Sequence, residues 1–203
     1  MQLIFARHGE SVANVTREIS NRGFKHGLTD LGRRQALELA TRIQSPVLEI
    51  YSSPLRRAVE TAQILAKTWR VPYEIVDALR EYDCGVLEGR ADEDAWRDHV
   101  EVRRQWYEEH NLDYRSEGGE SLLDIQARFV PFAHGLIEKY RDVLKTIVCV
   151  GHGGTYRAAL PLVLTNADHE LAVHHSMGNT DFIVAEPRAE GLFCLSWCGT
   201  SLV

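Results

Sequence analysis

The sequence predicts an α/β fold, a three-layer αβα sandwich with a mostly parallel central sheet and one antiparallel edge strand. Short apolar runs alternate with longer segments in which apolar residues recur at helical spacing, which is typical of strands joined by crossover helices. The runs at residues 3–6 and 146–150 are almost wholly apolar, as expected for strands buried on both faces. The last two runs follow each other closely, which indicates a hairpin at one edge of the sheet.

Each expected helix begins at a recognisable signal. The expected strands are residues 3–6, 48–51, 73–76, 146–150, 181–185 and 192–197, and the expected helices are residues 29–43, 53–66, 121–136 and 155–164. Thr29 is a preferred N-cap residue. Ser53 and Pro54 are typical of a capping residue followed by proline at the first helical position. Ser121 and Asp124 have the spacing of a capping box.

A chain of 203 residues is long enough for one well-buried α/β domain, and we expect a single domain over residues 1–203. We find no basic and apolar leader and no apolar run of membrane-spanning length, so we expect a cytoplasmic protein. Cys194 and Cys198 lie four residues apart in an expected strand, roughly 13 Å and beyond disulfide reach. Free thiols and no zinc site are therefore expected.

The formal net charge of −6 argues against nucleic acid or an anionic membrane as the main partner. Residues 88–120 contain eleven acidic residues and five arginines, so this segment accounts for the whole net charge. Aromatic residues at helical spacing predict a lid or cap insertion over residues 90–117. The candidate substrate contacts in this lid are Trp96, Arg97, Arg103 and Trp106. Aromatic residues with this spacing serve packing more often than substrate binding.

Basic and histidine side chains follow three of the expected strands. Arg7 and His8 come directly after the first strand, Arg57 lies in the first turn after the second, and His152 precedes a Gly-Gly helix start. If these strands are parallel neighbours, their ends meet at one sheet edge, next to helix N-termini that attract anions. Two arginines and two histidines there form a site for a compact dianion, and a phosphoryl group is the natural candidate.

Six sequence blocks, spread in order along the chain, extend this pattern. They are Arg7-His8-Gly9-Glu10 with Asn14, Leu28-Thr29-x-x-Gly32, Ser53-Pro54-Leu55-x-Arg57-Ala58 with Thr61-Ala62, Leu79-x-Glu81 with Gly85 and Glu88-Gly89, Gly119-Glu120-Ser121, and Gly151-His152-Gly153-Gly154. Together they resemble the histidine phosphatase superfamily, in its phosphoglycerate mutase-like branch. The resemblance runs from the first strand to about Asn179 and lapses only between residues 90 and 117. Six ordered blocks are far more specific than any one of them.

The resemblance implies a role for each of the central residues. His8 would attack phosphorus and become phosphohistidine, while Arg7, Arg57 and His152 would bind the phosphoryl oxygens. Glu81 would protonate the leaving oxygen and then deprotonate water. Neutral imidazole is available near pH 7 and its phosphoryl adduct is labile, so one difficult displacement becomes two easier ones.

Other assignments stay open at this point. Two acidic neighbours in the sequence, Asp83 and Glu88, compete for the role of the acid. Asn14 either orients Arg7 or contacts the phosphate, or it is a turn residue. Gly153 is a candidate phosphate-binding residue, or its glycine pair allows close packing. The seven histidines outside the motifs are expected at the surface or in the core.

The function implied is a metal-independent phosphatase that hydrolyses small phosphate monoesters through a phosphohistidine, without a cofactor. The acidic lid is expected to repel polyanions and so to favour esters with neutral or partly cationic remainders. A bisphosphate-dependent phosphoglycerate mutase would share the catalytic residues, but mutases of this family resemble one another in a longer and more basic insertion. A non-catalytic phosphoprotein-binding module is the third option, although such modules usually lack the nucleophile or the acid. The oligomeric state stays open, a homodimer included.

Overall fold

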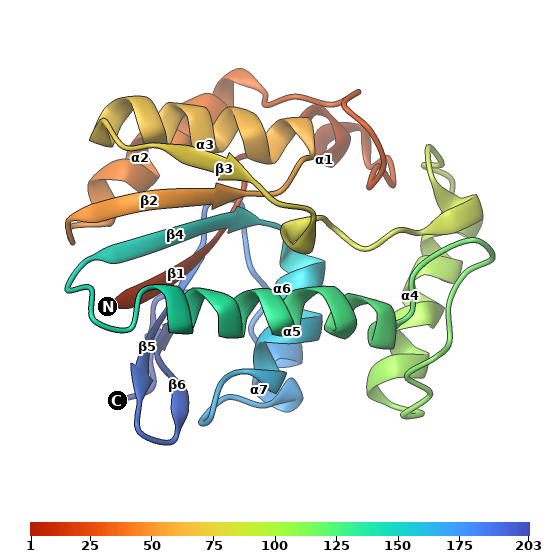
Figure 1. The fold of residues 1–203 in the computed structure, drawn as a ribbon. Coiled ribbons are helices and arrows are strands. Elements are labelled where there is room, and N and C mark those ends of the chain that lie inside the picture. Colours follow the sequence, from red (N-terminus) through yellow and green to blue (C-terminus); the bar gives the residue numbers. More distant parts are fainter.

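The computed structural model describes residues 1–203 and places a seven-stranded sheet between two layers of helices (Figure 1). The strands, in the sheet order β3-β2-β4-β1-β5-β6-β7, are Tyr73–Ile75, Val47–Ser52, Thr146–Gly151, Gln2–Arg7, Phe182–Arg188, Gly191–Trp197 and Thr200–Ser201. Strands β3, β2, β4 and β1 pair in parallel, whereas β5, β6 and β7 pair antiparallel. The predicted fold class is confirmed, and its antiparallel edge is a three-stranded ribbon in place of a single strand.

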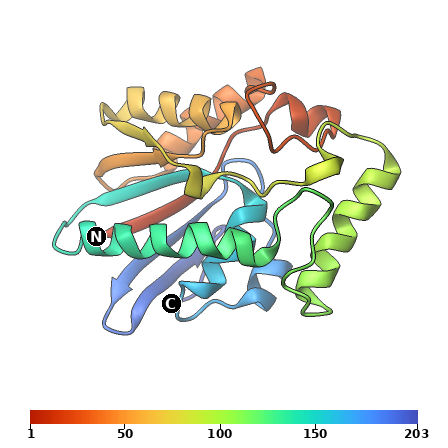
Figure 2. The same ribbon diagram turned by 45° about the vertical axis from the view of Figure 1, so that its right-hand side comes forward.

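The helices lie in two layers, with one helix set apart from both. They are α1 (Val12–Thr16), α2 (Asp30–Arg42), α3 (Arg56–Trp69), α4 (Glu93–Tyr107), α5 (Leu122–Lys139), α6 (Gly153–Ala159) and α7 (His169–His174), with short 3₁₀ turns at Asp77–Leu79, Gly85–Leu87 and Leu160–Leu162. Helices α2 and α3 cover one face of the sheet, and α5 and α6 cover the other (Figure 1). Helix α4 lies beyond the carboxyl ends of the parallel strands (Figures 1 and 2). None of these helices has the length and apolar character needed to span a membrane.

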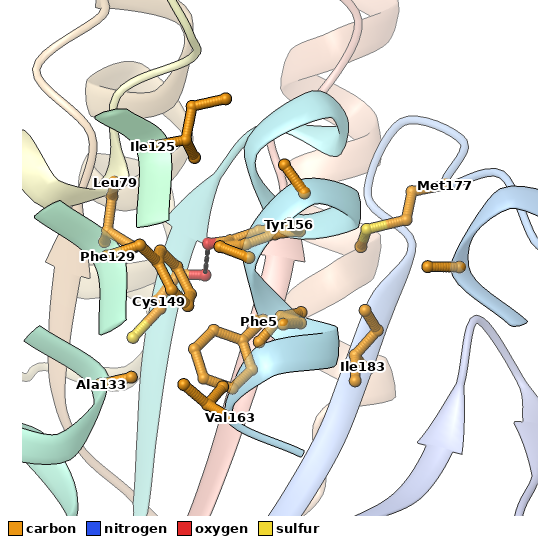
Figure 3. Close-up of a cluster of buried hydrophobic side chains, with 14 of the residues drawn as sticks. Phe5, Leu79, Ile125, Phe129, Ala133, Cys149, Tyr156, Val163, Met177 and Ile183 are labelled. Atoms are coloured by element: carbon orange, nitrogen blue, oxygen red, sulfur yellow. Dashed lines mark hydrogen bonds between the residues drawn. The ribbon is translucent and has the colours of Figure 1, made fainter. Parts of the chain in front are cut away.

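The buried side chains of β1 divide the hydrophobic core between the two faces of the sheet. Leu3 and Phe5 belong to one cluster of buried residues, and Ile4 and Ala6 belong to the other, as the two-residue period of a strand requires. Phe5 packs edge-on against Tyr156 with ring centroids 5.6 Å apart (Figure 3). Strand β1 is thereby clamped on both faces, and its carboxyl end, which carries the first sequence block, is fixed in space.

Two of the three predicted helix caps are confirmed. The Thr29 side chain accepts the N–H of Gly32 at the start of α2, and Ser121 forms a capping box at the start of α5. The Ser53 prediction is wrong, because α3 begins only at Arg56. The hydroxyl of Ser53 accepts the Leu55 N–H at 3.2 Å, which ties up the turn before the helix. All four cysteines are free thiols, as expected.

A close backbone approach fixes the loop that follows His8. A Cβ atom on Gly9 would overlap the carbonyl oxygen of Gly32, and one on Gly32 would overlap the carbonyl oxygen of Glu10. Only glycine allows the N-terminus of α2 to press against this loop. The first two sequence blocks therefore meet as backbone against backbone, directly beside the histidine.

We predict that Gly32→Ala lowers the free energy of unfolding by about 1–3 kcal/mol, because the added methyl group forces the loop and the helix apart. Gly135→Ala is the matched control on an exposed turn of α5, where an added Cβ meets no atom within 4 Å. This second change should raise the free energy of unfolding by roughly 0.5–1 kcal/mol through helix propensity. Denaturant titrations of both variants measure the difference, and equal effects would contradict the close approach.

Candidate active site

The carboxyl ends of β1, β2 and β4 bring three motif segments together. The backbone N–H of His8 donates to the Gly151 carbonyl at 3.1 Å, and that of Ser53 donates to the Val150 carbonyl at 2.9 Å. Hydrogen bonds that continue the sheet therefore extend one residue past each strand end. The side chains that follow these strands gather at one edge of the sheet, as predicted from their positions in the sequence.

Arg57 is buried between the two histidines of this edge. Its Nε donates to His8 Nε2 at 3.0 Å, and its Nη2 lies 3.4 Å from His152 Nδ1. Further hydrogen bonds go to the Ser20 carbonyl at 2.6 Å and to the side-chain oxygen of Asn21 at 3.4 Å. Arg57 is only 6% exposed, and burial lowers its pKa to about 10. No carboxylate forms an ion pair with it, so its charge has no direct anionic partner in the chain.

The surroundings of His8 define which ring nitrogen carries a proton and which carries a lone pair. Its Nδ1 lies 2.7 Å from the carbonyl oxygen of Gly9, and because a carbonyl only accepts, this nitrogen carries the proton. Nε2 then presents its lone pair towards Arg57. Burial, followed by the charges of Arg57 and Arg7, lowers the pKa of His8 well below the usual value for imidazole. At neutral pH the ring is therefore an uncharged base whose Nε2 accepts a hydrogen bond from Arg57.

His152 is the N-cap residue of α6, and its ring centroid lies 5.0 Å from that of His8. Since Nδ1 accepts from Arg57, the proton is on Nε2, which lies 2.7 Å from the Ser53 hydroxyl oxygen. Burial, then the charge of Arg57, lowers the pKa of His152 well below its usual value. The Ser53 hydroxyl, expected to be a helix cap, instead orients this imidazole.

His8 and Arg57 line a cavity of about 210 Å³, and His152 lies behind Arg57 without lining it. Arg7 is half-buried in its wall, donates to the Met177 carbonyl, and has a pKa that is lowered mainly by burial. Like Arg57, it forms no ion pair with a carboxylate. Two guanidinium groups that are removed from water without anionic partners are costly unless a ligand supplies the negative charge. The cavity is therefore suited to a compact anion.

Glu81 also lines this cavity, at the N-terminus of α6. One of its oxygens accepts the N–H of Gly154 at 3.0 Å, and the other accepts the N–H and the hydroxyl of Thr155 at 2.7 and 2.9 Å. The carboxylate is thus oriented by backbone donors and by the positive end of the helix. A proton donor or acceptor at this place can reach a group bound between the two arginines.

The two rivals of Glu81 are occupied elsewhere. Asp83 pairs with Arg22 at 2.7 Å, and Glu88 accepts the N–H groups of Asn21, Arg22 and Cys84. Neither residue lines the cavity. Of the three candidates, Glu81 alone lines the cavity.

Asn14 and Gly153 both line the cavity, and each combines a structural and a ligand-facing role. The side-chain oxygen of Asn14 accepts the Ser11 N–H at 3.0 Å, which caps α1, and its amide nitrogen is left for a ligand. Gly153 is the first residue of α6, so its N–H has no acceptor within the helix. The next two N–H groups of α6 bind Glu81, and that of Gly153 stays available to an anion.

Two of the four candidate substrate contacts in the lid lie at the cavity. Trp96 and Arg103 line the cavity. Arg97 does not, because its side chain is 71% exposed and pairs with Asp94 on the outer face of α4. Trp106 does not either, because it is 1% exposed and packs in the core against Tyr82, with ring centroids 5.2 Å apart.

The acidic residues of the predicted lid lie away from the cavity. None of the eleven acidic residues between 88 and 120 lines it, so this segment adds no carboxylate to the cavity wall. Three of the carboxylates on α4 lie within ion-pair distance of arginines of the same helix, as Glu101 does with Arg104 at 2.7 Å. The side of α4 that faces the cavity carries Arg103 instead. His99, expected at the surface or in the core, also lines the cavity.

Sequence reasoning missed Asn21 and Arg157, which also line the cavity. Arg157 follows Gly153 by four residues on α6, so helical spacing could have placed it on the same face. Asn21 lies in a segment without periodicity, and no signal in the sequence distinguishes it.

Comparison with known proteins decides the family. The family model described as histidine phosphatase superfamily (branch 1) matches residues 3–200. The chain belongs to this superfamily. A glucosyl-3-phosphoglycerate phosphatase of Mycolicibacterium vanbaalenii is 30% identical over 206 residues, which cover 94% of this chain and 87% of that protein. A 6-phosphofructo-2-kinase/fructose-2,6-bisphosphatase of Aquarana catesbeiana is 33% identical over 172 residues, which cover 83% of this chain but only 34% of that protein.

A solved structure supports the same placement. The structure of a mycobacterial glucosyl-3-phosphoglycerate phosphatase in complex with VO3 superposes with a TM-score of 0.82 at 26% identity, covering 97% of this chain and 98% of that one. The predicted resemblance to the histidine phosphatase superfamily is thereby confirmed, both at the level of sequence and at the level of fold.

For this histidine phosphatase we predict an acid limb of kcat/KM that lies at unusually low pH. The lowered pKa keeps His8 unprotonated as the pH falls, so kcat/KM for p-nitrophenyl phosphate should stay level from about pH 8 to about pH 6. Activity is lost only as the pH drops through that lowered pKa. Arg57→Gln removes the second-largest cause of the shift and should move the acid limb to higher pH. A native limb centred on the ordinary imidazole pKa would contradict the prediction.

Proposed function

We propose that this protein is a phosphatase that hydrolyses small phosphate monoesters through a phosphohistidine on His8, without a metal ion. One observation carries the proposal: the unprotonated Nε2 of a buried histidine faces a buried arginine that has no anionic partner. A nucleophile and the positive charge for a transferred phosphoryl group are thus in contact in the resting protein. Phosphoryl transfer depends mainly on such positioning and charge, which side chains can supply.

In the first step, His8 Nε2 attacks phosphorus in line with the ester oxygen. The N–P bond forms as the P–O bond breaks, and the leaving oxygen takes a proton from Glu81. Arg7, Arg57 and the Gly153 N–H donate to the three remaining phosphoryl oxygens, and His152 becomes a further donor when the bound dianion favours a proton on its Nδ1. The phosphoryl oxygens replace the imidazole nitrogens as acceptors of the Arg57 hydrogen bonds.

In the second step, a water molecule attacks the phosphohistidine from the side that the alcohol has left. Glu81, now a carboxylate, accepts a proton from this water. Its hydrogen bonds to Gly154 and Thr155 hold the carboxylate in place for this step. The N–P bond breaks, phosphate is released, and His8 regains its lone pair.

The relatives support hydrolysis as the reaction, because one of those reported above is a phosphatase that is covered over most of its length. The free thiols of all four cysteines fit a reducing compartment, and we propose that the enzyme acts in the cytoplasm. The mutase and the binding module are tested by the experiments that follow.

We predict an acid-labile phosphoenzyme when the native protein is mixed with a phosphate ester and quenched rapidly. His8→Ala should abolish the label and should lower turnover about 10³-fold or more, because the nucleophile is lost. In the native protein, the label and the turnover should persist with a chelator present. A native protein that binds phosphate but never becomes labelled would indicate the binding module. Transfer of phosphate between the 2 and 3 positions of phosphoglycerate, with little release to water, would indicate the mutase.

A second prediction tests whether Glu81 is the acid that protonates the leaving oxygen. Glu81→Gln should slow phosphoenzyme formation from an alkyl phosphate about 10²–10⁴-fold, because the alkoxide leaves poorly without a proton. Phosphoenzyme formation from p-nitrophenyl phosphate should change far less, since its leaving group needs no proton. Glu88→Gln is the matched control, because Glu88 lies outside the cavity. Equal losses on both esters would exclude Glu81 as the acid.

A further inference from the structure

Two arginines outside the phosphoryl site stand between the catalytic cavity and a second cavity. The second cavity has a volume of about 520 Å³ and lies between α4 and α7. Arg103 from α4 and Arg157 from α6 are the two residues that line both cavities. A group that extends from the catalytic cavity into the second cavity therefore passes these two guanidinium groups.

Neither arginine is satisfied within the chain. No hydrogen bond and no ion pair joins either side chain to another residue, and the buried Nε of Arg103 has no partner at all. Glu108 and Glu170 line the second cavity, but neither is within ion-pair distance of Arg103 or Arg157. Most other arginines of α4 and its flanks are paired with carboxylates, as Arg97 and Arg104 are. Two unpaired cations in a cavity wall mark a place for a negatively charged group.

A third unsatisfied donor lies beside them. The Tyr82 hydroxyl lies 2.7 Å from His99 Nε2, and the two rings stack with their centroids 5.7 Å apart. His99 Nδ1 is buried and without a partner. Burial, and then the charges of Arg103 and Arg157, lower the pKa of His99 to about 4, so the ring is neutral at pH 7. When the hydroxyl donates to Nε2, the proton of the ring is on Nδ1, which is then a free donor.

The position of Arg157 ties this group to the leaving side of the reaction. Arg157 lies three and four residues after Gly154 and Gly153 on α6, so it shares their helix face. The N–H of Gly154 holds Glu81, which we have proposed as the acid that protonates the leaving oxygen. An anion bound by Arg157 would thus belong to the alcohol part of the ester rather than to the transferred phosphoryl group.

We propose that Arg103 and Arg157, with His99, bind a carboxylate on the leaving group, so that the preferred substrates are phosphate esters of hydroxy acids. The inference rests on the proposed phosphatase function and deepens it. The planar fork of arginine matches a carboxylate, and the cavity of about 210 Å³ has to hold the phosphoryl group and this second anion together, which favours a compact molecule. A substituent on the hydroxy acid would extend into the second cavity.

The test compares esters that differ only in the carboxylate. Two matched pairs are 3-phosphoglycerate with glycerol 3-phosphate, and O-phosphoserine with phosphoethanolamine. The native enzyme should favour the acid of each pair by about 10–100-fold in kcat/KM, as expected for charged hydrogen bonds that one substrate lacks. Arg157→Gln and Arg103→Gln should each reduce that ratio at least about fivefold. Arg97→Gln, exposed on the same helix as Arg103, should leave it unchanged.

Binding gives the same comparison without turnover. Calorimetric titration of the His8→Ala protein with each member of a pair should show the same preference for the acid. Turnover of p-nitrophenyl phosphate with no preference within either pair would overturn the carboxylate site and leave the phosphatase intact. If the native enzyme hydrolysed no ester but the His8→Ala protein still bound the acid of each pair more tightly, the phosphatase function would be overturned and the carboxylate site would stand. A bisphosphate preferred over both acids, with the same dependence on Arg157, would also overturn the proposal, because the second group would be phosphoryl.

Discussion

The contact between Arg57 and the two histidines is the constraint on which the rest of the site depends. A guanidinium group that is 6% exposed and lacks an ion pair is held only by neutral acceptors, two of which are the imidazoles of His8 and His152. Burial, and then this charge, lower the pKa of both rings, and the charge is itself left available for an anion. The fold maintains this arrangement by ending three parallel strands side by side and by fixing the proton of each ring through Gly9 and Ser53.

Helix α6 gives the site its second organising element. Its N-cap is His152, its first N–H is free, and its next two N–H groups hold Glu81. A short helix thus presents an imidazole, a free backbone amide and a carboxylate in a fixed order, and these are the groups to which we assign phosphoryl binding and proton transfer. The glycines at its start keep the backbone accessible, and Arg157 one turn later continues the positive surface outward.

The sequence predicted those parts that follow from local pattern and strand order. Apolar runs located β1, β2 and β4, and the residues after them necessarily meet at one edge of a parallel sheet, which placed His8, Arg57 and His152 correctly. Orientation on α4 was not predictable in this way, since net charge does not state which helix face a residue occupies. The acidic residues turned outward and Arg103 turned inward. The role of Ser53 was also missed, because the imidazole that its hydroxyl orients belongs to His152, 99 positions further along the chain.

The anchoring of α4 bears on how such an enzyme acquires new substrates. Val102 and Trp106 anchor this helix, because both are buried in the same hydrophobic core that supports β1. Trp96, His99 and Arg103 of the same helix line the cavity, and none of the three is a fully buried member of that core. Stability and selectivity therefore occupy different positions of one helix. Substitutions on the cavity side can redirect the enzyme to another alcohol at little cost in folding, while the chemistry at the sheet edge is left as it is.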